Sequence, residues 1–210
     1  MKQHRAGLLL AIGLLVVILD QLLKIWVKTT FYLGEDVALT SWFHLAFVQN
    51  PGMAFGWEMG SKLALTLFRI VAIGVGIWYI CRLLGQNTPK PFGYMVCIAL
   101  IVAGAAGNVI DCMFYGLIFD NPMPPFTAAI FPAEGGYGSF LHGQVVDMLY
   151  FPLFSFNWPD WVPFVGGDYF EFFHPVFNLA DSAITVGIIA LILFYSKHLN
   201  NDSESSDAKA

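Results

Sequence analysis

Long apolar stretches alternate with polar or mixed connections along the chain. Four of them, running from about 6 to 28, 62 to 84, 92 to 111 and 179 to 197, are close to the roughly 20 apolar residues that a helix needs to cross a bilayer. Glycine is tolerated in such helices, so Gly74 and Gly76 do not argue against the second stretch. The pattern predicts an all-α membrane protein built as a four-helix transmembrane bundle.

Composition supports a membrane setting. Hydrophobic residues make up 57% of the chain, and charged residues make up only 12%, about half the share in an ordinary soluble domain. A soluble protein of 210 residues could not bury so much apolar surface. The apolar run after Arg5 is too long for the hydrophobic region of a signal peptide, so we expect a retained first helix.

Lysine and arginine are distributed unevenly between the connections. If the spans alternate, Lys2 and Arg5, Arg82 and Lys90, and Lys197 all lie on one side. The connections 29–61 and 112–178 contain neither residue type, although Lys28 and Lys62 lie at their borders. Because cytoplasmic loops carry the excess of positive charge, we expect both termini in the cytoplasm and both long connections outside.

The longer outer connection is rich in aromatic residues, glycine and proline. Its runs 144–151 and 153–158 are typical of short strands separated by turns. We therefore expect a small extracytoplasmic β platform with an outer aromatic-rich loop, resting on the membrane surface. Residues 1–199 form a single integral membrane domain in this interpretation, and the polar segment 200–210 forms a disordered cytoplasmic tail.

Several charged residues lie within the predicted spans, where charge is costly. Asp20 and Lys24 are four residues apart and share a helix face, which favours a mutually neutralising pair but also allows a role in holding an outer loop. Arg69 cannot lose its proton, so it must meet backbone carbonyls or a carboxylate, with Asp111 and Asp20 as candidates. A structural role is favoured for Arg69.

Other polar residues gather at the outer ends of the spans. Asn108 and Asp111 share a helix face, and taken alone they fit helix packing and loop anchoring. Asp181 opens the fourth span, where Asn178 could cap the helix equally well. Asp147 is a single acid in an apolar run, which a strand-edge carboxylate facing water would also explain. The residues alone leave structural and functional roles open.

Five motifs, taken together and in order, resemble those of the bacterial lipoprotein signal peptidases, also called signal peptidase II. They are Asp20-Gln21-x-x-Lys24, Asn50-Pro51-Gly52-Met53-Ala54-Phe55-Gly56, Gly107-Asn108-x-x-Asp111, Val145-Val146-Asp147 and Phe177-Asn178-x-Ala180-Asp181-Ser182-Ala183-Ile184. Each motif alone is weak, but five in order on four spans of the expected orientation are specific. The resemblance covers nearly the whole chain up to Ile184.

The resemblance implies an aspartic endopeptidase of the bacterial cytoplasmic membrane, with its site at the extracytoplasmic face. Such enzymes remove the signal peptide of a prolipoprotein by cleaving just before a diacylglyceryl-modified cysteine. By this resemblance, Asp147 and Asp181 form the catalytic pair. The family positions that shape the site and contact substrate correspond to Asn50, Gly52, Asn108 and Asn178, and the structural supports correspond to Asp20, Lys24 and Asp111.

The chain departs from the family pattern at two places. Cys112 stands where the family usually has arginine after the third-span aspartate, and we hypothesise that Arg69 replaces the missing cation. An insert, around residues 117–142, also lengthens the segment before Asp147. It places Asp120 at the family's usual distance with the same Gly-x-x-x-Asp spacing, but Asp120 leads into a proline-rich loop. We therefore prefer Asp147, which is followed by an apolar strand.

Two carboxylates can hydrolyse a peptide without a metal or a nucleophilic side chain. One takes a proton from water while its protonated partner polarises the scissile carbonyl. The five histidines are scattered without ligand spacing, so we expect no metal and no cofactor. The expected partners are lipidated prolipoprotein signal peptides and membrane lipid, with no nucleic acid, and we expect a monomer.

Two other functions remain possible from the residues. A proton-coupled membrane transporter would distribute acids through the membrane and usually contain a repeat, whereas here the acids gather at one face and we find no repeat. A non-catalytic lipoprotein-binding membrane protein would tolerate Asp→Asn changes at both candidate positions. Cleavage assays on such variants separate these functions from the peptidase.

Overall fold

Four long helices form the bundle in the computed structural model, which describes residues 2–50, 62–86 and 90–207. They are α1 (Lys2–Thr30), α2 (Lys62–Gly85), α3 (Phe92–Ile110) and α5 (Leu179–Asp207). All four contain a segment long and apolar enough to cross a membrane. The predicted class, a four-helix membrane bundle with a small β platform, is confirmed.

Helix α3 lies at the centre of the bundle and packs against α1, α2 and α5. A glycine allows its closest approach to α5, because a Cβ atom at Gly104 would lie only 2.3 Å from the carbonyl oxygen of Ala180. Small residues at such positions let transmembrane helices pack backbone to backbone. This packing brings the C-terminal end of α3 and the N-terminal end of α5, which carry the candidate polar residues, next to each other.

The third span does not stop where the sequence predicted. The chain continues from α3 through a π-helical turn, Asp111–Tyr115, into the short helix α4 (Gly116–Ile118). One π turn inside an α-helix usually marks a functional site. Here the turn begins at Asp111, whose side chain is fully buried.

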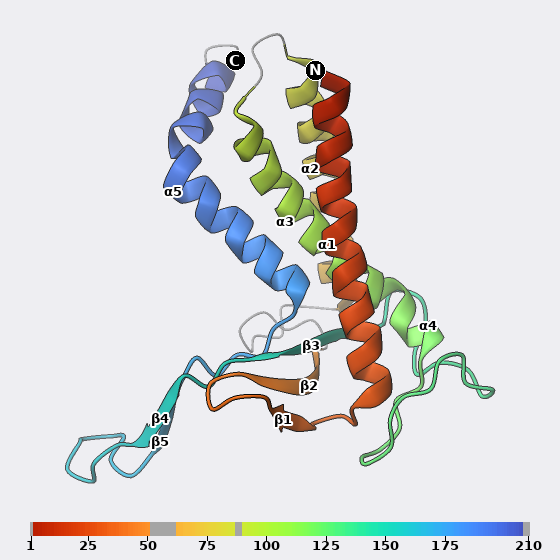
Figure 1. Cartoon of the computed structure of the whole chain (residues 1–210), viewed down its shortest axis with the longest axis vertical. Helices are drawn as coiled ribbons and strands as arrows, with labels where there is room; N and C mark the ends of the chain where they lie inside the picture. Colours follow the sequence, from red (N-terminus) through yellow and green to blue (C-terminus); the bar gives the residue numbers. More distant parts are fainter. Residues whose placement is uncertain (1, 51–61, 87–89, 208–210) are drawn as a thin grey trace.

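Two small antiparallel sheets lie at the end of the bundle opposite both chain termini (Figure 1). The first has the order β1-β2-β3, with β1 (Asp36–Ala38), β2 (His44–Asn50) and β3 (Val145–Tyr150); the second pairs β4 (Phe154–Asn157) with β5 (Tyr169–Phe172). Strands β3 and β4 confirm the two predicted runs. Strands β1, β2 and β5 were not predicted.

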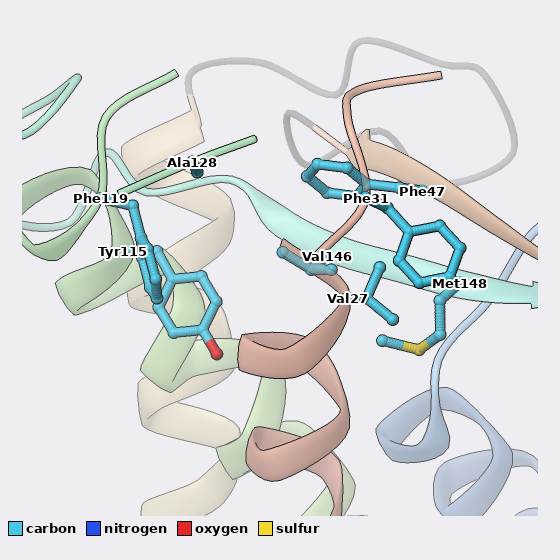
Figure 2. Packing of buried hydrophobic residues seen from close by; sticks show 8 residues of the cluster. All are labelled: Val27, Phe31, Phe47, Tyr115, Phe119, Ala128, Val146 and Met148. Atoms are coloured by element: carbon cyan, nitrogen blue, oxygen red, sulfur yellow. The ribbon is translucent and has the colours of Figure 1, made fainter. Parts of the chain in front are cut away.

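A hydrophobic cluster joins the end of α1 to the first sheet and to the insert (Figure 2). Its buried members are Val27, Phe31, Phe47, Tyr115, Phe119, Ala128, Val146 and Met148. Because they come from the end of α1, β2, β3, the π-helical turn and the insert, the cluster holds the platform on the bundle. The strand that carries Asp147 is therefore part of this core.

Helix α5 continues to Asp207, whereas the sequence predicted a disordered tail from residue 200. Extending an existing helix adds one hydrogen bond per residue without the cost of a new nucleus, so a polar segment can continue a helix that lipid and packing have already formed.

Candidate active site

Asp147 lies in the middle of β3, the strand that joins the sheet to the hydrophobic core. Its neighbours Val146 and Met148 are buried, and Asp147 itself is only 4% exposed. Strand β2 covers one edge of β3, with Val48 opposite Asp147. A carboxylate in such a place has little water around it, so its protonation depends on the few polar groups that it contacts.

Asp181 lies in the first turn of α5 and is partly buried. The residue that caps this helix is Asn178, whose Oδ1 accepts a hydrogen bond from the backbone N–H of Asp181 at 2.9 Å. The sequence left Asp181 and Asn178 as equal candidates for this cap. Because Asn178 fills it, the Asp181 carboxylate is available for other contacts.

Two asparagine amides join the carboxylates into one hydrogen-bonded row. Asn178 Nδ2 donates to Asp147 Oδ1 at 2.7 Å, and Asn108 Nδ2 donates to Asp181 Oδ1 at 2.7 Å. Asn178 Nδ2 also donates to Asn108 Oδ1 at 3.1 Å. The row brings together residues from β3, α3 and the start of α5.

The direction of both amides follows from neighbours that can only donate. Asn108 Oδ1 accepts from Lys24 Nζ at 2.8 Å, and an ammonium group has no acceptor. Asn178 Oδ1 is occupied by the backbone N–H of Asp181. Each amide oxygen is therefore engaged, and each NH2 group must point toward a carboxylate.

The surroundings raise the pKa of Asp147 to about 7. Burial is the largest cause, and the negative charge of Asp181 adds to it; hydrogen bonds from Asn178 and Asn50 and the charge of Lys24 act in the opposite direction. Two interacting carboxylates titrate as a pair. Near neutral pH the Asp147 carboxyl can therefore still bind a proton that an exposed carboxylate would have lost.

Lys24 lies beneath the row and uses all three of its N–H donors. They reach Asp20 Oδ2 at 2.9 Å, Asp111 Oδ2 at 2.8 Å and Asn108 Oδ1 at 2.8 Å. The two carboxylates and the lysine side chain are all fully buried. The predicted pair of Asp20 and Lys24 is present, and Asp111 is its third member.

The two acids that bind Lys24 also hold the elements that carry the candidate catalytic residues. Asp20 Oδ1 accepts from the backbone N–H of Ala180 at 2.9 Å, directly before Asp181. Asp111 Oδ2 accepts from the backbone N–H of Val146 at 3.2 Å, directly before Asp147. One buried ionic cluster thus binds the backbone beside both aspartates.

A known family now accounts for this arrangement: a family model described as Signal peptidase (SPase) II matches residues 12–197. The chain belongs to the signal peptidase II family. A protein of Porphyromonas gingivalis named lipoprotein signal peptidase is 49% identical over 187 residues, covering 89% of this chain and 82% of the relative. A relative of the same name from Amoebophilus asiaticus is 42% identical, covering 87% of this chain and 75% of the relative.

Solved structures show the same fold. A bacterial membrane enzyme determined by the in meso method at 2.3 Å superposes with a TM-score of 0.60 at 23% identity, covering 93% of this chain and 91% of that one. A second such structure, at 1.9 Å, gives 0.59 at 24% identity. Signal peptidases are proteases, so the transporter and the non-catalytic binding protein are not favoured.

Other residues singled out by the signal peptidase II motifs lie around the row or outside the described chain. Asn50 ends β2 and hydrogen bonds to the Asp147 side chain. Gly52 lies outside the described residues. Asp120 Oδ1 accepts from the backbone N–H of Ala129 at 2.7 Å within the insert. Asp120 thus stabilises a loop, whereas Asp147 belongs to the row.

Arg69 does not pair with the acids that the sequence suggested. Among the described residues, Asp20 and Asp111 are the partners of Lys24, and Arg69 Nη1 instead donates to Cys112 Sγ at 3.7 Å. The expectation of an Asp111 or Asp20 partner was wrong because Lys24 reaches both acids from within the same helix bundle core. The guanidinium nevertheless lies against Cys112, the position where the family usually has arginine.

Sequence reasoning missed the wider role of Gln21. Its Nε2 donates to Asp111 Oδ1 at 2.9 Å and to the carbonyl oxygen of Gly107 at 3.1 Å, and its Oε1 accepts from Tyr115 at 3.2 Å. Gln21 therefore ties α1 to the π-helical turn. Its place beside Asp20 in the first motif was the only available signal, since all these partners are distant in sequence.

Proposed function

We propose that this chain is an aspartic endopeptidase that removes the signal peptide from diacylglyceryl-modified prolipoproteins, cleaving before the lipidated cysteine. The observation that carries the proposal is the row in which Asn178 and Asn108 each donate to one aspartate at 2.7 Å. The names of the relatives support the substrate class. The row supports the chemistry, because it holds two carboxylates near enough for the charge of Asp181 to raise the pKa of Asp147.

The raised pKa of Asp147 suggests how the two aspartates divide their work. Asp147, with its pKa near 7, carries the proton in the resting enzyme, and Asp181 acts as the base. Asp181 takes a proton from a water molecule, and the resulting hydroxide adds to the scissile carbonyl carbon. Asp147 gives its proton to the carbonyl oxygen. The product of this step is a tetrahedral diol with no net change in charge.

The second step returns the aspartates to their starting state. The proton on Asp181 passes to the leaving amide nitrogen, one hydroxyl of the diol returns its proton to Asp147, and the carbon–nitrogen bond breaks. The products are a carboxylic acid at the end of the signal peptide and a free amine on the lipidated cysteine. All atoms come from the peptide and one water, so both steps balance, and the proposed steps use only the two aspartates.

Cleavage by purified variants tests the catalytic pair. The full chain in detergent is incubated with a synthetic lipidated prolipoprotein, and the loss of the signal peptide is followed by mass. We expect cleavage by the parent, even after a chelator is added, and none by Asp147→Asn or Asp181→Asn. Asp120→Asn is the matched control and should cleave like the parent. Normal cleavage by both dyad variants would sink the assignment.

Arg69 is proposed as the cation that compensates for Cys112. Its guanidinium is half-buried and lies on the Cys112 thiol at the outer end of the bundle. Arginine can bind oxygen atoms of a substrate there with several donors at once. Arg69→Ala should therefore weaken cleavage, and Arg69→Ala with Cys112→Arg should recover part of it. Equal activity of the parent and Arg69→Ala would contradict this role.

The same proposal includes the orientation of the protein. Both termini lie in the cytoplasm, and the sheets and catalytic pair lie at the extracytoplasmic face of the bacterial inner membrane, where the chain acts as a monomer. The supporting observation is that the N- and C-termini share one end of the bundle and the sheets share the other (Figure 1). A reporter enzyme fused to the C-terminus, active only in the cytoplasm, should be active.

A further inference from the structure

Lys28 lies one helical turn after Lys24, but it is not part of the ionic cluster. Its side chain is fully buried. Within the described part of the chain, no oxygen accepts a hydrogen bond from its Nζ. Burial of an ammonium group without an acceptor is unfavourable, so another interaction must keep Lys28 in place.

Three aromatic rings surround the Lys28 ammonium, and the negative charges of Asp120 and Asp111 also attract it. The Lys28 Nζ lies 5.5 Å from the ring centre of Phe47, 5.4 Å from that of Phe119 and 5.1 Å from that of Tyr137. All three distances are within the roughly 6 Å at which a cation is attracted to a ring face. Phe47 belongs to β2 and the other two rings to the insert, so one charge joins the end of α1 to both of these segments; Figure 2 shows Phe47 and Phe119 there.

The Tyr137 ring leads directly to the strand of Asp147. Its hydroxyl oxygen accepts a hydrogen bond from the backbone N–H of Gln144 at 2.7 Å. The preceding backbone N–H, of Gly143, donates to the carbonyl oxygen of Cys112 at 2.8 Å. A Cβ atom at Gly143 would lie 2.0 Å from the carbonyl oxygen of Asp111, so the chain enters β3 through a closely packed passage.

We propose that Lys28 is a positioning residue for the reaction, acting through the Tyr137 ring and the Gln144 backbone on the strand that carries Asp147. This inference rests on the proposed role of Asp147. The insert thereby has a function of its own, because it supports the catalytic strand and is held in place by the buried Lys28 ammonium. Tyr137 links the two, since its ring contacts Lys28 and its hydroxyl oxygen binds the Gln144 backbone.

The proposal separates the charge of Lys28 from its size. Lys28→Met keeps an unbranched apolar stem of similar length among the rings but removes the cation. Lys28→Arg keeps a cation that stacks on aromatic rings. Tyr137→Phe keeps the ring that faces Lys28 and removes only the oxygen that binds Gln144. These three substitutions interrupt the connection at different points.

The test uses the purified full chain in detergent and a lipidated prolipoprotein, with kcat and KM measured separately. We expect Lys28→Met and Tyr137→Phe each to lower kcat about tenfold to a hundredfold, the range for small displacements of a catalytic group, with KM unchanged. Lys28→Arg should restore most of kcat. The double variant of Lys28→Met and Tyr137→Phe should be no slower than either single variant, because both act on one path.

A matched control is Lys90→Met. Lys90 also lies over a tyrosine ring, with its Nζ 5.7 Å from the ring centre of Tyr94, but at the opposite end of the bundle. We expect its kcat to equal that of the parent. Lys90 is only partly buried, and its Nζ also donates to the carbonyl oxygen of His198 at 3.0 Å. A general sensitivity of the protein to loss of a cation over a ring would instead lower kcat in Lys90→Met as well, and this would overturn the proposal.

The remaining outcomes are equally decisive. The proposal fails if Lys28→Met or Tyr137→Phe retains the parental kcat, or if Lys28→Arg is as slow as Lys28→Met. If Lys28→Met does not fold to a single species, Tyr137→Phe decides alone, since it loses one oxygen atom. If the parent itself does not cleave, the proposed function fails. If the parent and Lys28→Met both cleave normally and Asp147→Asn does not cleave, only the role of Lys28 fails.

Discussion

Asn178 is the residue whose replacement tests the proton arrangement most directly. Its two ends have different tasks, because Oδ1 caps α5 by accepting from the backbone N–H of Asp181 at 2.9 Å, while Nδ2 donates to Asp147 at 2.7 Å. Asn178→Ser retains an oxygen that can cap the helix but lacks the amide donor. Asn178→Ala loses both. Comparing the two variants separates the cap from the effect on the carboxylate.

The size of the effect follows from what the amide contributes. A hydrogen bond to a charged group is worth roughly 1.5–3 kcal/mol, and about 1.4 kcal/mol corresponds to one pH unit in a pKa. The Asn178 donor favours the ionised form of Asp147, so its loss should raise the pKa of Asp147 by roughly one to two pH units above the value of about 7. The lost cap in Asn178→Ala should additionally cost about 1 kcal/mol of stability.

The assay is the pH dependence of kcat/KM, which reports the ionisations of the free enzyme. In the proposed mechanism Asp147 is the acid, so the alkaline limb of the profile should move to higher pH in both Asn178 variants. The unfolding temperature should fall mainly in Asn178→Ala. An alkaline limb that stays in place, or moves to lower pH, would refute the assignment of the proton to Asp147.

Three further predictions concern stability and close approach. Asp147 binds its proton more tightly in the folded chain, where its pKa is about 7 rather than 3.8, so folding becomes less favourable as pH rises through this range. In thermal unfolding in detergent, Asp147→Asn should therefore have a higher unfolding midpoint than the parent at about pH 8 but not at about pH 4. An equal difference between variant and parent at both pH values would contradict this prediction. Lys24→Met leaves two buried carboxylates without their cation and should cost about 3–5 kcal/mol, seen as a lower unfolding midpoint together with lost cleavage; an unchanged midpoint would argue against the ionic cluster as a support. Gly104→Val should separate α3 from α5 and lower the unfolding midpoint, since even a Cβ would lie 2.3 Å from the Ala180 carbonyl oxygen. An unchanged midpoint would mean that the two helices can shift apart freely. Gly74→Val is the matched control, because nothing lies within 4 Å of its Cβ.

The helices could be predicted from the sequence because lipid imposes a strong and local rule. About 20 apolar residues in succession suffice to identify a span, and all four predicted spans lie within α1, α2, α5 or the continuous helix from α3 to α4. The platform was less accessible. Strand β2 pairs with β3, so Asn50 is opposite Val145, and a pairing between segments so far apart in sequence leaves no local pattern.

The polar site also depends on contacts between residues far apart in sequence, which no local pattern predicts. The four-residue spacing of Asp20 and Lys24 predicted their ion pair, since such residues share a helix face. Of the third and fourth members of the cluster, Asn108 comes from α3 and Asp111 begins the π-helical turn after it, and their spacing showed only that they share a face. Arg69 illustrates the consequence: the sequence offered it the same two acids as Lys24, and only the packing of α1 against α3 decides between the two cations.

Two independent routes determine the hydrogen bonds at the candidate catalytic pair. From one side, the Lys24 ammonium engages the oxygen of Asn108 and so directs its NH2 group to Asp181. From the other, the first turn of α5 engages the oxygen of Asn178 and directs its NH2 group to Asp147. Reversal of either amide would place its oxygen against a carboxylate and its NH2 group against a donor, which costs two hydrogen bonds at once. In the proposed reaction, both amides therefore stay donors to the carboxylates while Asp181 takes a proton from water and Asp147 gives its proton to the scissile carbonyl.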